Sequence, residues 1–344
     1  MKYSAVIPAY NAETTIENTV ESLRRSGLAD YEILIIDDGS KDATPQICDR
    51  LAETYGELRC VHQKNAGVSA ARNRGIQEAG GEYIWFFDAD DYVDENSTGR
   101  MLEVMQEHAP DMLIFGLSFD FFKNGEMYER WDLVYDAEAA YTRDSIKRDF
   151  KKLYDSNALT TSCNKLIKRS VLIENGLGFD QNLFLMEDLL FSVNTIKKCD
   201  SIYVLPQTIY RYVYLEVKSV EDEPTTKRLN RIPRLSEYLK PFETALEDQP
   251  EVLAALFYML LGQKLRTLKP AEIAVVADDF CAGPYSSGRL FELCPQGMKK
   301  TAMLLKKKKC FRIYLRQRKN RIRRKIITII KRTAIYEIIK GRKR

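Results

Sequence analysis

The first 115 residues alternate between short apolar runs and segments in which apolar residues recur at helical spacing. The apolar runs predict five strands, over Tyr3–Ile7, Ile33–Ile36, Leu58–His62, Tyr83–Phe87 and Met112–Phe115. The segments between them predict four helices, one carrying Ile16, Val20 and Leu23 and three over Thr44–Tyr55, Val68–Ala79 and Thr98–His108. Continuously apolar strands separated by helices are typical of a parallel sheet covered on both faces. We therefore expect an α/β fold whose ligand site lies at the carboxyl ends of the strands.

The pattern after residue 115 is less regular. It predicts a hairpin over Phe119–Tyr135 around Asn124-Gly125 and strands at Ile202–Leu205 and Thr208–Tyr214. It also predicts helices over Asp144–Tyr154, over Lys168–Glu174 and from Glu187 to about Lys198. Helical spacing returns after Pro224 and continues to about residue 270, whereas residues 270–298 give no clear prediction.

No segment predicts a membrane span or a signal peptide. The longest apolar run, Val252–Leu261, has about half of the roughly 20 residues that a spanning helix needs. The apolar run that follows Met1 stops at Pro8, which is too early for a signal peptide. We therefore expect a cytoplasmic protein.

Cysteine and histidine usage argues against several kinds of site. The seven cysteines show no C-x-x-C spacing, so we expect buried free thiols rather than a disulfide framework or a zinc site. The only histidines, His62 and His108, are too few for most histidine-based metal sites and leave little room for a Ser-His-Asp triad.

Charge is divided unequally along the chain, although the net charge is only +4. Residues 299–344 hold 20 Lys+Arg and one acid, a charge of +19, which leaves −15 for residues 1–298. This basic tail has an apolar residue at every fourth position from Ile322 to Ile338, the pattern of an amphipathic helix lying on a membrane. The Lys306–Lys309 cluster suits an anionic membrane surface. We expect three parts: an α/β domain over 1–220, a helical accessory region over 221–298, and the basic tail over 299–344, which would hold the protein on the inner face of the cell membrane.

Two other interpretations of the basic tail stay open. Its helix could pack on the acidic body of the chain, with its bases paired there. It could also bind nucleic acid, but it has only three aromatic residues on which bases could stack, so we expect no nucleic acid.

The segment Asp88-Ala89-Asp90 directly follows a predicted strand. Two carboxylates one residue apart at a strand end can face the same hard cation, and Mg²⁺ and Mn²⁺ prefer such oxygen ligands. The alternative is a solvated loop that leads into the next helix.

Three more segments carry candidate chemistry. Asp37-Asp38-Gly39-Ser40 could bind a base or ribose, or form an Asx-type turn. The segment Asn65–Asn73 combines small residues at a helix start with Arg72, which suits an anion, although Arg72 could equally be solvated on an alanine-packed helix. Glu187-Asp188 opens a helix and could act chemically or as a simple cap.

Together, these segments closely resemble family 2 glycosyltransferases of the GT-A fold. The resemblance rests on V-I-P-A-Y-N at 6–11, I-D-D-G-S at 36–40, N-A-G-V-S-A-A-R-N at 65–73, F-F-D-A-D-D at 86–91 and M-E-D at 186–188. It is dense over residues 1–115 and continues more weakly to about residue 218. It implies a Rossmann-like, mainly parallel sheet flanked by helices, with a C-terminal helical extension, in an enzyme of the bacterial surface-polysaccharide type.

The resemblance also implies a reaction and a donor site. The family transfers a sugar, with inversion, from a nucleotide-diphosphate donor, most often a UDP-sugar, and we expect a glycan or lipid-linked glycan as acceptor. By this resemblance Pro8, Ala9 and Tyr10 line the nucleotide. Asp38 contacts the base with Asp37 in support, and Asn65 and Arg72 contact the base and the diphosphate.

The remaining roles implied by the resemblance concern the metal and the base. Asp88 and Ala89 contact the donor, and Asp88 and Asp90 hold Mn²⁺ or Mg²⁺, Asp90 more directly. Asp188 is the general base, with Glu187 beside it. Inversion by a single displacement needs such a base opposite the leaving diphosphate, whose charge a metal and an arginine neutralise.

Two other functions are compatible with the same motifs. A catalytically silent protein that binds sugar nucleotides or nucleic acid would bind without turnover. A nucleotidyltransferase would also use paired carboxylates and a metal, but it would consume a nucleoside triphosphate and release pyrophosphate.

Overall fold

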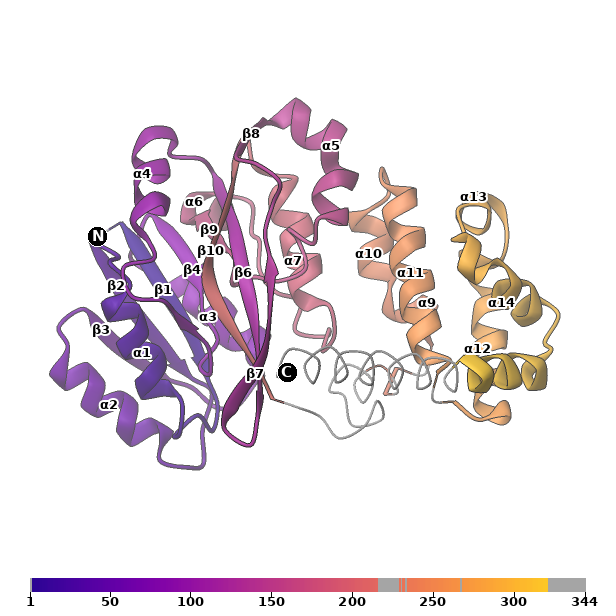
Figure 1. Ribbon diagram of the computed structural model, residues 1–344, viewed down its shortest axis with the longest axis horizontal. Coiled ribbons are helices and arrows are strands. Elements are labelled where there is room, and N and C mark those ends of the chain that lie inside the picture. Colours follow the sequence, from indigo (N-terminus) through magenta and orange to yellow (C-terminus); the bar gives the residue numbers. More distant parts are fainter. Residues whose placement is uncertain (1, 216–228, 230, 233, 267, 321–344) are drawn as a thin grey trace, which may run out of the picture. The chain divides into compact units, whose positions relative to one another are not determined.

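A computed structural model describes residues 2–215, 229, 231–232, 234–266 and 268–320, and the account below concerns these residues. The chain divides into two compact units, Met1–Glu216 and Val217–Arg344. Each unit is described by itself (Figure 1).

The first unit is built on one mixed β-sheet. Its amino-terminal strands are all parallel and lie in the order β3-β2-β1-β4; they are β1 (Tyr3–Ala9), β2 (Tyr31–Asp37), β3 (Leu58–His62) and β4 (Tyr83–Phe86). The sheet continues in the order β9-β6-β10-β5 through β9 (Lys165–Lys168), β6 (Met112–Lys123), β10 (Ser201–Leu215) and β5 (Tyr92–Val93). Two further strands, β7 (Glu126–Leu133) and β8 (Ala139–Thr142), pair with β6 and β10.

Helices cover both faces of this sheet. On one face α1 (Ile16–Arg25), α2 (Thr44–Thr54) and α4 (Gly99–His108) share a hydrophobic core with alternate residues of the strands, including Ala5 and Ile7. On the other face lie α3 (Val68–Glu78), α6 (Arg169–Glu174) and α7 (Glu187–Ile196). Helix α3 approaches β1 so closely that a Cβ atom at Gly75 would lie 2.2 Å from Val6 Cγ1. One further helix of this unit, α5 (Arg143–Asp155), follows β8. The predicted layering of helices on a sheet is therefore confirmed.

The sheet departs from the predicted parallel arrangement at β9. This strand is antiparallel to both β4 and β6, between which it lies. We predicted a helix from Lys168, whereas that residue ends β9 and the helix begins one position later. The two strands predicted over 202–205 and 208–214 form a single strand, β10, with register shifts between Leu205 and Tyr210. The hairpin is confirmed, because Asn124 and Gly125 form a two-residue turn with positive φ between β6 and β7.

The second unit is helical in the part that the structure describes. Its helices are α9 (Leu235–Tyr238), α10 (Lys240–Ala245), α11 (Pro250–Lys264), α12 (Pro270–Ala282), α13 (Gly288–Glu292) and α14 (Gln296–Lys306), with a 3₁₀ turn η1 (Pro284–Ser286). The apolar α11 lies in its core, where Phe257 stacks on Tyr285 with ring centroids 3.6 Å apart. Residues 270–298, which gave no clear prediction, are therefore largely helical.

The basic tail is described only in part. Helix α14 crosses the predicted boundary at residue 299 and buries Thr301, Ala302 and Leu305, and residues 310–320 are helical. The apolar stripe from Ile322 to Ile338 lies outside the described residues, and the division into three parts stays a prediction. Within the described ranges, no helix combines the length and the apolar character that crossing a bilayer requires.

Candidate functional site

The carboxyl ends of β1, β2 and β3 bring three of the sequence motifs together. In the strand register Ala9 lies beside Asp37, and Asp37 lies beside His62. The Asp38 amide donates to the Ala9 carbonyl at 2.8 Å. Pro8 and Ala9 therefore adjoin the Asp37-Asp38 turn, as a shared donor site requires, and Tyr10 is exposed just beyond β1.

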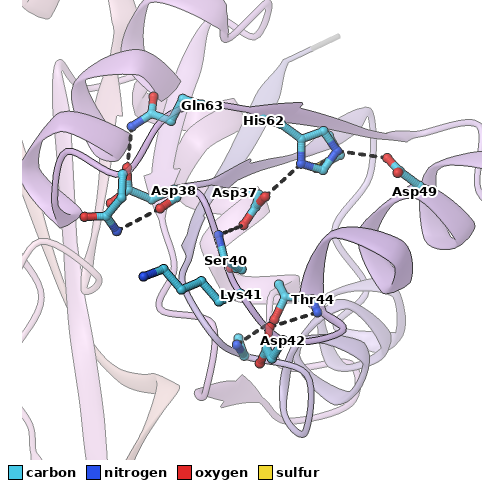
Figure 2. Close-up of polar contacts among 12 residues, drawn as sticks. Asp37, Asp38, Ser40, Lys41, Asp42, Thr44, Asp49, His62 and Gln63 are labelled. Carbon is cyan, nitrogen blue, oxygen red and sulfur yellow. Dashed lines mark hydrogen bonds and ion pairs between the residues drawn. The ribbon is translucent and has the colours of Figure 1, made fainter.

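Asp38 organises the loop that leads into α3. Its carboxylate accepts hydrogen bonds from the backbone amides of Ala66 and Gly67, at 2.9 and 2.8 Å. It also accepts from Gln63 Nε2 at 2.7 Å (Figure 2). Asn65 Nδ2 donates to the Asp38 carbonyl at 2.8 Å. Two of the predicted base contacts, Asp38 and Asn65, thus lie together, and the carboxylate of Asp38 is engaged by donors of the chain itself.

Asp37 has two partners on opposite sides. Its Oδ1 accepts from the Ser40 amide at 3.1 Å, three residues on rather than the two of an Asx turn, and its Oδ2 lies 2.8 Å from His62 Nδ1 (Figure 2). His62 Nε2 lies 3.0 Å from Asp49 Oδ1. The carboxylates of Asp37 and Asp49 raise the pKa of His62 to about 9.

Arg72 connects the Asp88-Ala89-Asp90 loop to Asp188. Its two terminal nitrogens donate to Asp188 Oδ1 and to Asp88 Oδ1, each at 2.8 Å. The side chain of Arg72 is 6% exposed, while those of Asp88 and Asp188 are 26% and 23% exposed. Burial by itself would lower the pKa of Arg72, but the two carboxylates, Asp188 foremost, raise it overall. Arg72 is therefore a buried, permanently charged link between two accessible carboxylates, and the interpretation of Arg72 as a solvated residue is wrong.

The three acids of the segment Asp88–Asp91, which follows β4, lie in different surroundings. Asp91 is 2% exposed; its carboxylate accepts from the Tyr210 hydroxyl at 2.5 Å and from the Val213 amide at 2.7 Å. The same Tyr210 hydroxyl accepts from the Asp88 amide at 3.0 Å. Asp90 is exposed at the loop. The carbonyl of Ala89 accepts from Thr19 Oγ1 at 3.0 Å. Asp91 therefore anchors the loop to β10, and Asp88 and Asp90 lie on the accessible side of the loop.

Asp88 and Asp90 form a donor set that fits a hard divalent cation. Loss of solvation, together with the negative charge of Asp88, raises the pKa of Asp90. A cation between the two would remove that repulsion, and carboxylate oxygens are the ligands that Mg²⁺ and Mn²⁺ prefer.

Asp188 lies in the first turn of α7, where the backbone turns sharply. Met186 precedes the helix in the left-handed conformation, with φ of 67°, and Glu187 and Asp188 follow. A bulky residue in that conformation costs about 1–2 kcal/mol, and such strain is common at functional sites. The Asp188 carboxylate contacts Arg72 and accepts from the Ser162 amide at 3.2 Å, while Glu187 is buried beside it.

Sequence reasoning assigned no supporting role to several residues that hold this site in place. Asp91 adjoined a recognised motif and could have been singled out as the third carboxylate of the loop. Tyr210 and Ser162 carried no local signal, because their positions follow from strand pairing and loop packing. Lys165 is fully buried; it donates to the Thr161 carbonyl and to Asn164 Oδ1, the latter at 2.6 Å, and burial lowers its pKa to about 7. It thus holds the segment that presents the Ser162 amide to Asp188.

Comparison with known proteins agrees with this geometry. The uncharacterized glycosyltransferase EpsJ of Bacillus subtilis is 29% identical over 61% of this chain and 60% of its own length. The poly(ribitol-phosphate) beta-glucosyltransferase of Bacillus spizizenii is 30% identical over 62% of this chain and 32% of its own length. The chain thus spans about 60% of the first relative and a third of the second.

A solved structure and a family model extend the comparison. The crystal structure of S. aureus TarS 1–349 in complex with UDP-GlcNAc matches with a TM-score of 0.65 and 21% identity, over 91% of this chain and 89% of that one, which supports the GT-A fold. The model of glycosyl transferase family 2 matches residues 4–176. That match covers half of the chain and contains the nucleotide-side motifs together with the Asp88-Ala89-Asp90 loop, so this chain belongs to glycosyl transferase family 2.

Proposed function

We propose that this chain transfers a sugar from a nucleotide-diphosphate donor, a UDP-sugar, to a hydroxyl group of a cell-surface glycan or a lipid-linked acceptor. The transfer is an inverting single displacement. The observation that carries the proposal is the contact of Arg72 with both Asp88 and Asp188 at 2.8 Å. One buried guanidinium thus contacts both the proposed base and a proposed metal ligand, which supports the proposal.

Asp188 is the proton acceptor in this proposal. An acceptor hydroxyl loses its proton as it attacks the sugar, and a positioned carboxylate can take that proton. The Ser162 amide and the Arg72 guanidinium fix the orientation of Asp188 by two hydrogen bonds. Glu187 is buried beside it in the first turn of α7, where the helix dipole favours negative charge.

The donor lies along the carboxyl ends of β1–β4 in this proposal. Pro8, Ala9 and Tyr10 line the nucleotide. Asp38 and Asn65 shape the base site, and Asp37 supports the Asp38 turn through the Ser40 amide. Arg72 lies on the diphosphate side, and the backbone at Asp88 and Ala89 borders the donor.

Asp88 and Asp90 would hold Mn²⁺ or Mg²⁺. Such an ion, when bound, neutralises negative charge on the leaving diphosphate. The chain contributes the rest: Tyr210 and Asp91 fix the loop that carries both carboxylates, and Arg72 sets the orientation of Asp88.

The acceptor is proposed from chemistry and from one relative. A family relative is named for glucosyl transfer to poly(ribitol-phosphate), a polymer whose ribitol units offer hydroxyl groups between phosphates. The basic tail would hold the enzyme at an anionic membrane surface where lipid-linked acceptors are exposed.

Substitution of the two key carboxylates tests the proposal. Asp188→Asn should lower the rate of sugar transfer by about 100-fold or more and change UDP binding far less, because the amide keeps the size of the side chain and an oxygen for Arg72 but cannot take the proton. Asp90→Ala should weaken donor binding in the presence of Mn²⁺ as well. Asp155→Asn, on the exposed surface of α5, is the matched control. Full activity of Asp188→Asn would rule out the assigned base.

Product analysis distinguishes the alternative functions. The purified chain should release UDP, not pyrophosphate, from a panel of nucleotide sugars, and the product should have the opposite anomeric configuration. Release of pyrophosphate from a nucleoside triphosphate would indicate a nucleotidyltransferase. Donor binding without any turnover over the whole panel would indicate the catalytically silent protein.

The tail is tested separately, by truncation after residue 320. This cut leaves α14 and the helical residues 310–320 in place and removes ten of the 20 bases in the tail. The truncated chain should leave anionic liposomes at physiological salt, while its activity on a soluble acceptor is retained. Unchanged liposome binding would contradict the role of this segment.

A further inference from the structure

Three side chains with different metal-binding atoms meet beside the donor-site turn, at the outer edge of the parallel strands. Asp49 comes from α2, and Cys60 and His62 come from β3. His62 Nε2 lies 3.0 Å from Asp49 Oδ1 and 3.8 Å from Cys60 Sγ, and the three ligand atoms all lie within 4.8 Å of one another. An oxygen, a nitrogen and a sulfur atom thus face a common point.

A fourth side chain orients the histidine toward this point. Asp37 Oδ2 lies 2.8 Å from His62 Nδ1, on the side of the ring away from Asp49 (Figure 2). When a metal ion displaces the proton of Nε2, the carboxylate that accepts the proton of Nδ1 holds the ring with the Nε2 lone pair toward Asp49 and Cys60. This arrangement of a carboxylate behind a histidine is common at metal centres, where it fixes the tautomer and raises the basicity of the ligand.

The donor atoms select a particular class of cation. Thiolate, imidazole and carboxylate together suit Zn²⁺ and its analogue Co²⁺, whereas Mg²⁺ and Mn²⁺ prefer oxygen alone. The carboxylate and the thiolate balance the two positive charges. Three protein ligands leave the fourth tetrahedral position for water or another ligand.

We propose that Asp49, Cys60 and His62 form a binding site for Zn²⁺, oriented by Asp37 and distinct from the Asp88-Ala89-Asp90 loop. The sequence does not reveal it, because one ligand comes from a helix and two come from alternate positions of a strand, without C-x-x-C spacing. Bound zinc ties α2 to β3. Because Asp37 also holds the Ser40 amide, the metal steadies the turn that contains Asp38.

Direct metal binding tests this proposal without any reference to enzymatic activity. The full chain, stripped by a chelator and titrated with Zn²⁺ alone in a calorimeter, should bind one equivalent at this site. With Co²⁺ it should show the near-ultraviolet charge-transfer band of a thiolate ligand. Excess Mn²⁺ should not displace either ion, which separates this site from the Asp88-Ala89-Asp90 loop.

Variants then identify the ligands. Cys60→Ser should abolish the cobalt band, and Asp49→Asn and His62→Gln should weaken zinc binding at least tenfold. Asp37→Asn should weaken it about 10–100-fold, as expected for a residue behind a ligand. Cys281→Ser, which alters a half-buried thiol of the second unit, is the control and should change nothing.

Two results would overturn the proposal. One is the absence of a thiolate band in the cobalt-loaded wild-type chain. The other is unchanged zinc affinity in Asp49→Asn, whose exposed side chain can be altered without disturbing the core. Neither readout involves sugar transfer. Rejection of the zinc site would therefore not affect the proposed enzymatic function, and rejection of that function would not affect the zinc site.

Discussion

The carboxylate of Asp188 lies 2.8 Å from a terminal nitrogen of Arg72, a residue 116 positions earlier in the chain. The other terminal nitrogen of Arg72 contacts Asp88 at the same distance. The candidate base and the candidate metal loop therefore share one hydrogen-bond donor. A movement of the Arg72 side chain would change the hydrogen bonding of both carboxylates.

Arg72→Lys should lower transfer activity by about 100-fold, a loss similar to that from removing one fixed donor in an active site. A lysine ammonium is a compact charge that cannot reach two carboxylates in the fixed geometry of a guanidinium. Steady-state kinetics would measure the loss, and circular dichroism would verify the fold. Arg74→Lys, on the same helix and paired only with Glu78 at its surface, should retain activity. Equal activity of the two variants would refute the positioning role.

Tyr210→Phe should destabilise the first unit by about 1–3 kcal/mol, because it leaves the buried Asp91 carboxylate and the Asp88 amide each short of a partner. Tyr83→Phe is the matched control: the Tyr83 hydroxyl is also buried, but it has no hydrogen-bond partner among the described residues. Its removal should be neutral or slightly stabilising. Thermal unfolding measures the stability of both variants. Equal stability of Tyr210→Phe and Tyr83→Phe would show that the Tyr210 hydroxyl has no structural role.

Gly39→Ala should lower both stability and donor affinity. Gly39 has φ of 70°, and a Cβ atom there would lie 2.8 Å from the Asn65 amide nitrogen, so the two donor-site loops would have to separate. We expect a cost of about 1–2 kcal/mol from the backbone conformation alone, and a raised KM for the donor. Gly56→Ala meets no atom within 4 Å and should leave both quantities unchanged. A Gly39→Ala variant with the wild-type KM would show that the loop contact does not shape the donor site.

Glu32→Gln should lower the free energy of unfolding at neutral pH. It should also make that free energy depend less on pH in the acidic range. Burial alone would raise the pKa of Glu32, but hydrogen bonds from Ser4, the Gly80 amide and Arg59 outweigh it, so the pKa is lowered. The stabilisation that ionised Glu32 provides is complete above its pKa in the unfolded chain, about 4.5. It is lost as the pH falls through the lower pKa that Glu32 has in the folded chain.

The stability gap that tests Glu32 should therefore be about 1–3 kcal/mol at pH 7 and should narrow below pH 4.5. Urea unfolding at the two pH values measures it. Glu53→Gln, at an exposed position of α2, should show no such gap. A gap for Glu32→Gln that stays constant with pH would contradict the lowered pKa.

The amino-terminal half of the first unit was predictable because its elements are specified locally. β1, β2 and β4 each contain an unbroken apolar run, such as Ile33–Ile36 in β2, and the helices between the strands carry their own apolar spacing. Strand β9 was not predictable, because it has only four residues, begins and ends with lysine, and becomes a strand by pairing with β4 and β6. Residues 270–298 gave no clear prediction, because the elements after α12 are short and are separated by glycine and proline.

The candidate site likewise contains residues that the sequence predicted and residues that it did not. The carboxylates at strand ends were visible as motifs. Their partners were not, because contacts such as Arg72 with Asp188 and Tyr210 with Asp91 depend on how distant segments meet. Asp37 was assigned only a supporting role, and its contact with His62 follows from the register of β2 and β3.

The dependence of Asp91 on β10 has a consequence for the synthesis of the chain. The ribosome delivers β1–β4 and the loop after them more than a hundred residues before Tyr210 and Val213, so the parallel strands can begin to fold while the loop's buried carboxylate still lacks its partners. The candidate site is thus completed only when β10 has been synthesised. A nascent chain stalled before residue 210 would present strands of a nucleotide fold with an unfinished metal loop.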